Sequence, residues 1–509
     1  MTPAQFRKHL ALSETQRFLF LAILIGVFAG LMVVCFHIAI DFISWYSLGA
    51  LSGKFRFGRL ISPTVGALAA TLLATRVFPA ARGSGVNQTK AALYISDGHV
   101  PTSTIFGKFV ACSIAIGSGN SLGPEDPSLQ MGAGVASLLG RLFKLGRKNM
   151  RLIAPVGAAA GIAAAFNTPI TGVLFVMEEV VASWNAGVVG SIVLSAVSAV
   201  VVTRWFLGND PLFLVPAFEL THASELVVYA LMGVAGGLLS AAFVKLIEAL
   251  RKRLERLPRS TELVQVLCAG FFVGFAGLWL PEVMGAGYDA IDFALHDRFP
   301  WNLLLILAAA KLIVTLFCFS TGIPGGMFAP TLFIGAMLGG GLGGLAQHYW
   351  PSPVSPGGAY VLVGMGTFFS GVFRAPMTSI FMVFEVSASY VIILPVMIAN
   401  TISYFISRRL APVPFFTMLA HQEGVDLPSA EEYRSTEVLR VEDAMQPVPV
   451  DADLSGAPRI YPDVPLDSAL RLLAHTEILR VASRAKPEEA IGVLRLEDVH
   501  HAYGIDGNR

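Results

Sequence analysis

Charge and cysteine are both scarce in this sequence. Asp, Glu, Lys and Arg make up 14% of its 509 residues, against about 25% in ordinary soluble domains. The four cysteines, Cys35, Cys112, Cys268 and Cys318, stand in apolar segments without the spacing of a zinc site or a disulfide framework. We therefore expect small core cysteines and no resident metal. The net charge of +1 says little by itself, but the basic clusters flank apolar segments, which does not indicate nucleic-acid binding.

Apolar residues are abundant, at 54% of the chain, and the mean hydropathy is +0.65. Long apolar stretches cover roughly 17–45, 59–80, 105–143, 152–206, 225–250, 263–294, 301–350 and 359–408. A single membrane crossing needs about 20 residues, so several stretches must fold back within the bilayer. The composition predicts an all-α polytopic membrane protein.

The distribution of charge suggests an orientation. The N-terminus is basic, but the apolar run behind it is too long for a signal peptide, so we expect no removable leader. Basic clusters at 7–17, 141–151, 251–259 and 408–409 favour the cytoplasmic side. We expect a multi-pass protein of the cell (inner) membrane, with both termini cytoplasmic.

Beyond about residue 410 the sequence becomes polar and proline-bearing, which predicts a small α/β cytoplasmic domain. Short β-like runs are expected at 441–450 and within 490–504. Between them, within 464–482, Leu466, Leu470 and Leu473 recur at helical spacing.

The membrane part contains an internal repeat. Residues 123–140 align without gaps on 326–343, and residues 157–178 align on 364–385, with similar offsets of 203 and 207. The matched pairs include Gly123 and Gly326, Pro127 and Pro330, Gly132 and Gly335, Gly157 and Gly364, and Glu178 and Glu385. Two blocks in the same order indicate a duplicated half. Because Glu178 has a repeat partner in Glu385, we expect these two acids to be structural.

Glycine and proline interrupt the apolar segments at corresponding places in the two halves. Such interruptions break helices within the bilayer, and the helix N-termini then present free N–H groups to a bound anion. Three stretches fit this description, "GSGVNQTK" from Gly83, "GPEDPS" from Gly123 and "GGMFAP" from Gly325. A glycine-rich packing contact or a helix cap is the alternative for each stretch.

Together these motifs resemble the CLC family of chloride channels and chloride/proton antiporters. The resemblance spans about residues 20–430 and rests on "GSG" at 83–85, "GPEDPS" at 123–128, "NTPITGVLFVMEE" at 167–179, "GGMFAP" at 325–330 and "PFF" at 414–416. It implies two inverted repeats of broken and re-entrant helices, and a homodimer with one pore per subunit.

The resemblance also implies roles for individual residues. Ser84 would offer its hydroxyl to the central anion, and the backbone N–H groups of Met327 and Phe328 would bind it from the second half. Glu125 matches the external gating glutamate, and Glu179 matches the internal proton-relay glutamate of exchanging members. The motif glycines and prolines are Gly83, Gly85, Gly123, Pro127, Gly326 and Pro330.

Two of these acids have simpler explanations, and Ser84 has a compatible one. Glu125 could be a first-turn acid that complements a helix dipole. Glu179, near the end of its span, could mark a solvated terminus. Ser84 could be an ordinary helix N-cap, which does not conflict with a role in anion binding.

The sequence departs from the family pattern in four places. Pro124 replaces a basic residue and Asp126 replaces glycine, so this entrance is about two charges more negative than usual, which should repel anions. Phe416 occupies the place of a tyrosine and offers no hydroxyl to the central anion, so we expect weaker binding. Asn87 occupies a proline position without an obvious role. Asp126 is either a spectator or the residue that sets this transporter apart.

We therefore predict a chloride transporter, and a chloride/proton exchanger rather than a passive channel, since both Glu125 and Glu179 are present. A fluoride or other anion exporter, and an intramembrane enzyme using Glu125 and Asp126 as a carboxylate pair, are the remaining alternatives. We expect no enzyme activity, no cofactor and no nucleic-acid partner; the partners are chloride, protons, lipid and a second copy of the chain.

The predicted parts are an N-terminal segment (1–16), two membrane halves (17–215 and 216–425) and a tail (426–509). The tail resembles one cystathionine-β-synthase (CBS) module, which normally binds adenine nucleotides in pairs. A single copy lacks the paired cleft, so we expect a structural cap, or pairing across a dimer, and no nucleotide binding.

Overall fold

The computed structural model describes residues 14–50, 56–181, 186–213, 215–216, 222–350, 354–387, 390–425, 427–428, 439–449, 454, 456–484 and 488–503. The chain separates into two compact units, Met1–Ala430 and Glu431–Arg509. The predicted N-terminal segment lies outside the described residues except for its last three positions.

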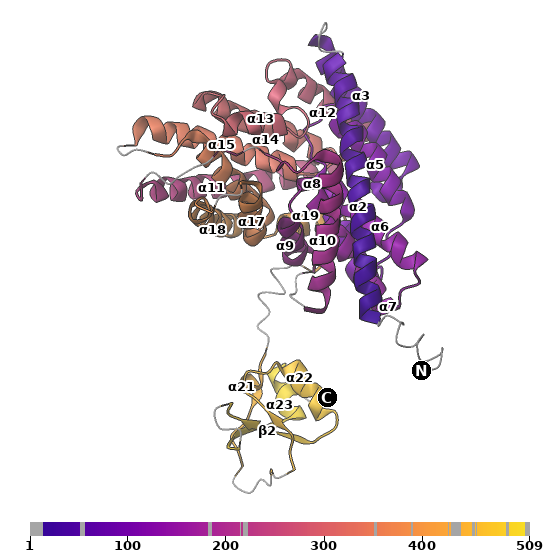
Figure 1. The fold of residues 1–509 in the computed structure, drawn as a ribbon, viewed down its shortest axis with the longest axis vertical. Helices are drawn as coiled ribbons and strands as arrows, with labels where there is room; N and C mark the ends of the chain where they lie inside the picture. The colour runs from indigo at the N-terminus through magenta and orange to yellow at the C-terminus, as the bar shows by residue number, and fades with distance from the viewer. Residues whose placement is uncertain are drawn as a thin grey trace. The chain divides into compact units, whose positions relative to one another are not determined.

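The described elements of the first unit are helices, joined by loops and turns (Figure 1). Its first-half α-helices are α2 (Glu14–Ser44), α3 (Arg56–Leu72), α4 (Gly85–Tyr94), α5 (Thr102–Gly117), α6 (Glu125–Leu142), α7 (Arg147–Arg151), α8 (Ile153–Phe166), α9 (Pro169–Phe175) and α10 (Ala186–Leu207). Those of the second half are α11 (Glu225–Glu255), α12 (Glu262–Gly277), α13 (Tyr288–Leu295), α14 (Trp301–Ser320), α15 (Phe328–Tyr349), α16 (Gly357–Phe373), α17 (Pro376–Ser387), α18 (Ile393–Leu410) and α19 (Phe415–Gln422).

Short π- and 3-10-helical segments connect some of these helices. They are η1 (Trp45–Ala50), η2 (Leu73–Val77), η3 (Pro79–Ala81), η4 (Val176–Val181), η5 (Arg259–Thr261) and η6 (Pro281–Val283).

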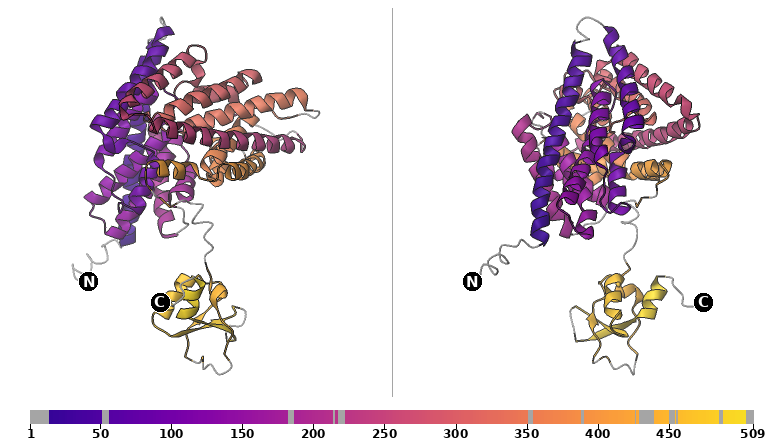
Figure 2. Two further views of the ribbon diagram at one scale, coloured as in Figure 1. Left: turned by 180° about the vertical axis from the view of Figure 1, so that it is seen from behind. Right: turned by 90° about the vertical axis from the view of Figure 1, so that its right-hand side faces the viewer.

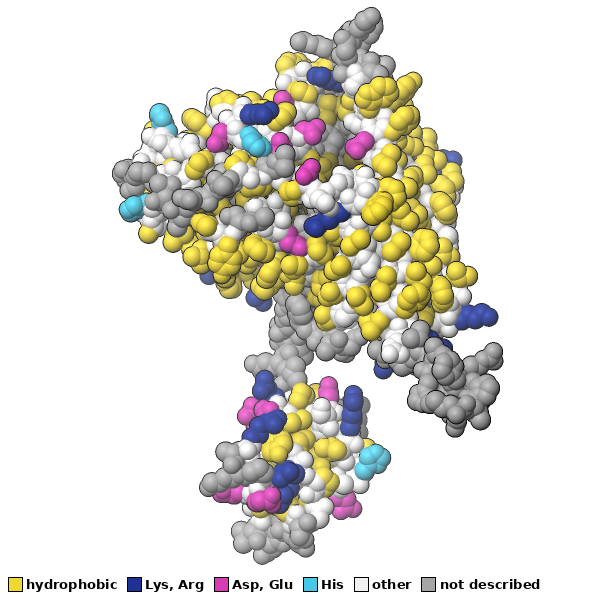
Figure 3. Space-filling model, in the orientation of Figure 1, with side chains coloured by type: hydrophobic (Ala, Val, Ile, Leu, Met, Phe, Trp, Pro, Cys, Tyr) yellow, Lys and Arg dark blue, Asp and Glu magenta, His cyan; other side chains and the backbone are white. Residues whose placement is uncertain are grey.

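Within the described residues, seven helices are long and apolar enough to cross a membrane. They begin at positions 16, 58, 147, 188, 225, 301 and 328, and four shorter apolar helices, α5, α12, α16 and α17, accompany them. Hydrophobic side chains cover the face around α2 and α10 (Figure 3). The chain is therefore a multi-pass membrane protein, and the long apolar stretches do fold back, since 105–143 contains both α5 and α6.

The two halves are related by matching helix crossings. A Cβ atom on Gly132 of α6 would lie 2.2 Å from the carbonyl oxygen of Gly157 in α8. In the second half, a Cβ on Gly335 of α15 would lie 2.4 Å from the carbonyl oxygen of Gly364 in α16. These are the residues that the repeat alignment pairs. The glycines bring the two helix backbones of each crossing into direct contact.

Reciprocal hydrogen bonds also join the halves. The Glu178 carboxylate accepts the N–H of Thr378 at 2.9 Å at the start of α17. The Glu385 carboxylate accepts the N–H of Thr171 at 2.7 Å at the start of α9. Each threonine hydroxyl donates to the same carboxylate, at 2.8 and 2.6 Å. Each glutamate thus caps a helix of the other half, so the prediction that these two acids are structural is confirmed.

The second unit is a small α/β domain with a three-stranded sheet. Its elements are α21 (Val441–Ala444), β1 (Arg459–Ile460), α22 (Leu466–Leu473), β2 (Ile478–Ala482), β3 (Ala490–Arg495) and α23 (Leu496–Ala502). The sheet has the order β1-β2-β3, with β1 parallel and β3 antiparallel to β2. Figure 2 shows the ribbon of this domain from two further sides. Leu466, Leu479 and Leu494 are buried in its own core.

Two local predictions are wrong. The run 441–450 does not begin as a strand, because the Asp443 carboxylate accepts the Arg440 N–H at 2.6 Å and closes the first turn of α21. Only Cys112 and Cys318 are core residues. Cys35 and Cys268 are exposed on the protein surface, because the helices that carry them also present an apolar outer face.

Candidate anion-binding site

Three helices begin beside one another near the contact between the two halves. α4 begins at Gly85 with Ser84 as its N-cap, α6 begins at Glu125, and α15 begins at Phe328. The loops before α6 and α15 pair directly, since Gly123 N–H donates to Gly326 O and Gly326 N–H donates to Gly123 O, both at 2.8 Å. The predicted motifs are thus assembled at one place.

Glu125 lies at this junction and is fully buried. Its Oε2 accepts the backbone N–H of Ala329, in the first turn of α15, at 3.3 Å. Its Oε1 accepts the hydroxyl of Tyr288, in α13. A Cβ on Gly123 would lie 2.3 Å from Oε2, so only glycine at position 123 lets the side chain fold back over the loop. The carboxylate therefore takes a place that an anion could occupy at a helix N-terminus.

Asp126 is directed elsewhere. Its carboxylate accepts the N–H of Gly85 at 2.8 Å, the N–H of Val86 at 3.1 Å and the hydroxyl of Ser84 at 3.2 Å. Ser84 has the predicted N-cap position, but its hydroxyl binds Asp126 instead of its own helix. Asp126 is therefore no spectator.

The two neighbouring acids do not form a carboxylate pair. Glu125 binds α13 and α15, whereas Asp126 binds the first turn of α4. Consecutive residues of a helix point about 100° apart, and each carboxylate has found a different set of donors. Within the described residues, no cluster of three or more His, Cys, Asp or Glu could hold a metal ion. The two carboxylates are therefore not arranged as the pair that the enzyme alternative assumes.

Phe416 packs into an aromatic cluster beside the α15 N-terminus. Its ring stacks on Phe373 with centroids 5.4 Å apart and an interplanar angle of 15°. Phe328 stacks on the same Phe373 at 4.8 Å. The Asn87 side-chain amide donates a hydrogen bond from Nδ2 to the carbonyl oxygen of Phe416 at 2.9 Å, which connects α4 to α19. Asn87 thus has a structural role, and the Phe416 side chain presents only apolar atoms to the site.

Glu179 lies in the π-helical segment η4 and is buried. Its carboxylate forms an ion pair with Lys90 of α4, whose side chain is only 3% exposed. The adjacent Glu178 turns to α17, so the two consecutive glutamates have different partners. A solvated terminus does not describe Glu179, because burial requires such an acid to be paired.

A second buried lysine supports the loop before α4. Lys108 of α5 donates its Nζ to the carbonyl oxygen of Gly83 at 2.7 Å. Gly83 has φ of +83°, a left-handed conformation that favours glycine. This loop geometry directs the first N–H groups of α4 towards Asp126.

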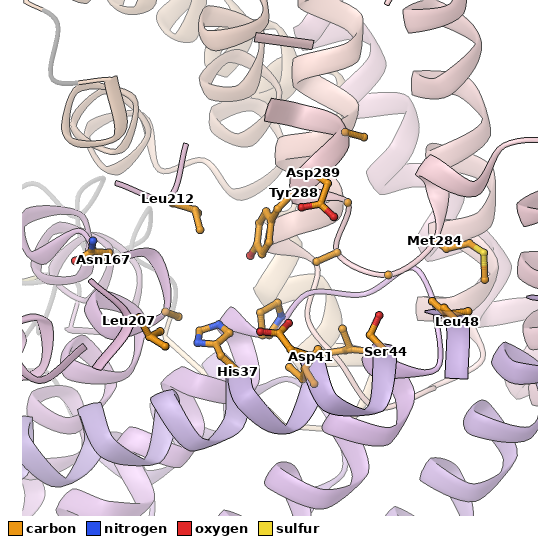
Figure 4. A pocket seen from close by; sticks show the side chains of 18 of the residues that line it. His37, Asp41, Ser44, Leu48, Asn167, Leu207, Leu212, Met284, Tyr288 and Asp289 are labelled. Atoms are coloured by element: carbon orange, nitrogen blue, oxygen red, sulfur yellow. The ribbon is translucent and has the colours of Figure 1, made fainter. Parts of the chain in front are cut away.

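A cavity of about 660 Å³ lies beside Glu125. Pro124 and Tyr288 line it, and Figure 4 shows the Tyr288 side chain opposite His37 and Asp41 of α2. Because the Tyr288 hydroxyl also binds Glu125, this side chain stands between the cavity and the carboxylate. The cavity is lined by four acidic residues, Asp41, Asp210, Glu282 and Asp289, and by two basic residues, His37 and Arg59.

Three residues of the site, Tyr288, Lys90 and Lys108, were not predicted from the sequence. An ionisable residue within an apolar stretch is a signal that would have found Lys108, which lies in 105–143. Lys90 lies between two apolar stretches and carries no such signal. Tyr288 ends the stretch "MGAGY" in the second half, and nothing in its local pattern distinguishes it. Only the fold brings it to Glu125.

Comparison with known proteins identifies the family of this chain. The family model of the voltage gated chloride channel matches residues 65–408. This chain belongs to that family, the CLC family. It is 32% identical over 422 residues to the "H(+)/Cl(-) exchange transporter ClcA" of Vibrio vulnificus, and the alignment covers 79% of this chain and 89% of that protein. A ClcB-like protein of Ralstonia nicotianae, provisionally named a chloride channel, is 31% identical over 80% of this chain and 98% of its own length.

The fold agrees with this assignment to the CLC family. The structure of a slow cyanobacterial Cl-/H+ antiporter superposes with a TM-score of 0.72 at 24% identity, over 80% of this chain and 98% of that one. The predicted family and fold class are therefore confirmed.

Proposed function

We propose that this chain is a chloride/proton exchanger in which Glu125 is the gate and Glu179 exchanges protons with the inner side. One observation carries the proposal: the Glu125 carboxylate binds the N–H of Ala329 at the start of α15, as a chloride ion would. Protonation removes the charge that holds the side chain there. The site then becomes available to an anion, and chloride and protons are coupled.

Several features of the chain support this function. The ClcA relative is named for H+/Cl- exchange. Ser84, Met327, Phe328 and Phe416 surround the proposed anion path, with Ser84 offering a hydroxyl and the α15 N-terminus its N–H groups. Chloride and protons are the substrates of this proposal, and we expect no nucleotide binding by the tail.

The test is chloride-driven proton movement in proteoliposomes. A chloride gradient should drive proton uptake, and Glu125→Gln should carry chloride without protons, since the neutral amide cannot deliver a proton. Glu179→Gln should reduce proton movement and spare chloride flux. Absence of chloride flux in the wild type, or intact proton coupling in Glu125→Gln, would refute the proposal.

A passive chloride channel is the second candidate, and the Lys90–Glu179 ion pair favours it. A carboxylate held by a buried lysine is less available to accept a proton from the inner side. In that case the wild type would carry chloride with no proton movement, and Glu179→Gln would change nothing. The chloride-to-proton stoichiometry separates the two candidates.

We also propose the assembly and location that the family implies. The protein is a homodimer of the cell (inner) membrane with cytoplasmic termini, and the CBS-like tail is a structural cap or pairs across the dimer. Mass photometry in detergent should give about twice the 54.2 kDa of one chain, beyond the mass of the micelle. A monomeric mass would contradict the dimer.

A further inference from the structure

Asp126 is an unusual residue to find at an anion path. It is 4% exposed, and all its hydrogen-bond donors are neutral: two backbone N–H groups and one hydroxyl from the first turn of α4. Within the described residues, no Lys or Arg forms an ion pair with it. A chloride ion bound without a fixed cation would be held by the same kinds of group.

Asp126 is not needed to hold the two helices together. A Cβ on Gly85 would lie 2.3 Å from the backbone oxygen of Asp126 and 3.0 Å from the Cβ of Gln130. α4 and α6 are therefore already in backbone contact here. The side chain of Asp126 adds charge at the α4 N-terminus, beyond what packing requires.

Asp126 also contacts the second half of the site. A Cβ on Gly326 would lie 2.9 Å from the Cβ of Asp126. The next two residues are Met327 and Phe328, whose N–H groups are the proposed anion donors. The Asp126 carboxylate thus stands between the donors of α4 and the loop that begins α15.

The charged and titratable groups around Asp126 come from several elements. Glu125 precedes it in α6, and Lys108 of α5 binds Gly83 O at 2.7 Å. Glu423, after α19, lies near the same loop, with its carboxylate oxygens 3.2 and 3.3 Å from where a Cβ on Gly83 would be. Arg251 of α11 is 3.9 Å from Glu423, and Cys112 of α5 is also close.

We propose that Asp126 is a tethered anion that competes with chloride for Ser84 and the N-terminus of α4. This inference rests on the proposed function, because it takes Ser84 as a chloride ligand. A chloride ion reaches these donors only when the Asp126 carboxylate moves away from them. Asp126 is thus a positioning residue that lowers the apparent affinity for chloride.

The test measures chloride binding to the purified full chain by isothermal titration calorimetry at pH 7. Asp126→Asn keeps the size of the side chain and removes its charge. Asp126→Gly removes the side chain altogether. Both should bind chloride roughly tenfold or more tightly at pH 7, as expected when a charge-assisted competitor is lost.

Asp292→Asn, on α13, is the matched control. It removes an acid that is 37% exposed and lies outside the site, so its affinity should equal that of the wild type. Thermal midpoints show whether each variant is folded. Two Asp126 variants are used so that the inference can still be tested if one of them does not fold.

The outcomes separate this inference from the proposed function. Unchanged or weaker chloride binding in both folded Asp126 variants would overturn it, since Asp126 would then only support α4. An equal gain in Asp292→Asn would also overturn it, because the effect would be general electrostatics. If the wild type neither binds nor carries chloride in the proteoliposome assay, the proposed function itself fails.

Discussion

Neighbouring residues at the start of α6 have different chemistry because their partners differ. Glu125 and Asp126 are both acids, both buried and consecutive in one helical turn. The Glu125 carboxylate accepts hydrogen bonds from the Tyr288 hydroxyl and from the N-terminus of α15, both in the second half. The Asp126 carboxylate accepts hydrogen bonds from the N-terminus of α4, in the first half. Each carboxylate therefore responds to a different part of the site.

Tyr288 should hold the gate closed. Its hydroxyl donates to Glu125, and a hydrogen bond to a charged group contributes about 1.5–3 kcal/mol. Tyr288→Phe removes this donor from the carboxylate, so the side chain should leave its position more readily. We expect chloride efflux from proteoliposomes at pH 7 to increase several-fold.

Tyr390→Phe is the control for Tyr288→Phe, because Tyr390 is 78% exposed. Its efflux should match that of the wild type. Unchanged or slower efflux in Tyr288→Phe would show that Tyr288 does not restrain Glu125.

Lys90 and Glu179 should depend on each other for stability. Removing one partner of a buried ion pair costs about 3–5 kcal/mol, because the other charge stays buried. Lys90→Met should therefore lower the thermal midpoint in detergent by several degrees, and adding Glu179→Gln should restore most of the loss. A double-mutant cycle measures this coupling.

Lys252→Met gives the comparison for an exposed pair, since Lys252 binds Glu248 at 2.6 Å on the surface of α11. We expect less than about 1 kcal/mol there. Additive losses for Lys90→Met and Glu179→Gln would mean that the buried pair is not coupled.

At the scale of the elements, glycine pairs set how closely the helices cross. A Cβ at Gly132 or Gly335 would meet a carbonyl oxygen of the facing helix. A carbonyl oxygen in a packed helix cannot turn aside, so the helices would have to separate. The same arrangement in both halves explains why the repeat alignment retains these glycines.

Gly132→Ala and Gly335→Ala should each destabilise the protein by about 1–3 kcal/mol, the usual cost of overpacking. Gly190→Ala is the control, because a Cβ there meets nothing within 4 Å and alanine favours a helix. Thermal unfolding in detergent measures all three. Equal stability of Gly132→Ala and Gly190→Ala would contradict the close crossing.

Much of the order of helices along the chain was predictable from the sequence. Repeated glycines and prolines marked the beginnings of α6 and α15, because such residues tolerate tight turns and the first helical turn. The pairing of Gly123 with Gly326 could not be predicted from a local pattern. It depends on two loops about 200 residues apart meeting within the bilayer.

At the scale of the whole molecule, the tail is a compact unit with its own hydrophobic core. We expect a chain ending at Ala430 to retain coupled exchange in proteoliposomes, with a rate within about twofold of the full chain. The reason is that the described partners of Glu125, Asp126 and Glu179, which include Tyr288, Gly85 and Lys90, lie in the first unit.

The measurement for this truncation is the chloride-to-proton stoichiometry at equal protein incorporation. An unchanged ratio with an unchanged rate fits a structural cap. Loss of coupling in a chain that still elutes as a single species would show that the tail takes part in transport.

The class of the protein, its repeat and its motif residues can be read from the amino-acid sequence, because hydropathy, glycine and proline act locally along the chain. The groups that those residues contact depend on how the helices pack. Tyr288 reaches Glu125, Lys90 reaches Glu179, and Asp126 reaches the N-terminus of α4. Each buried charge takes the donors that the folded helices bring to it, and that choice depends on contacts between residues far apart in the chain.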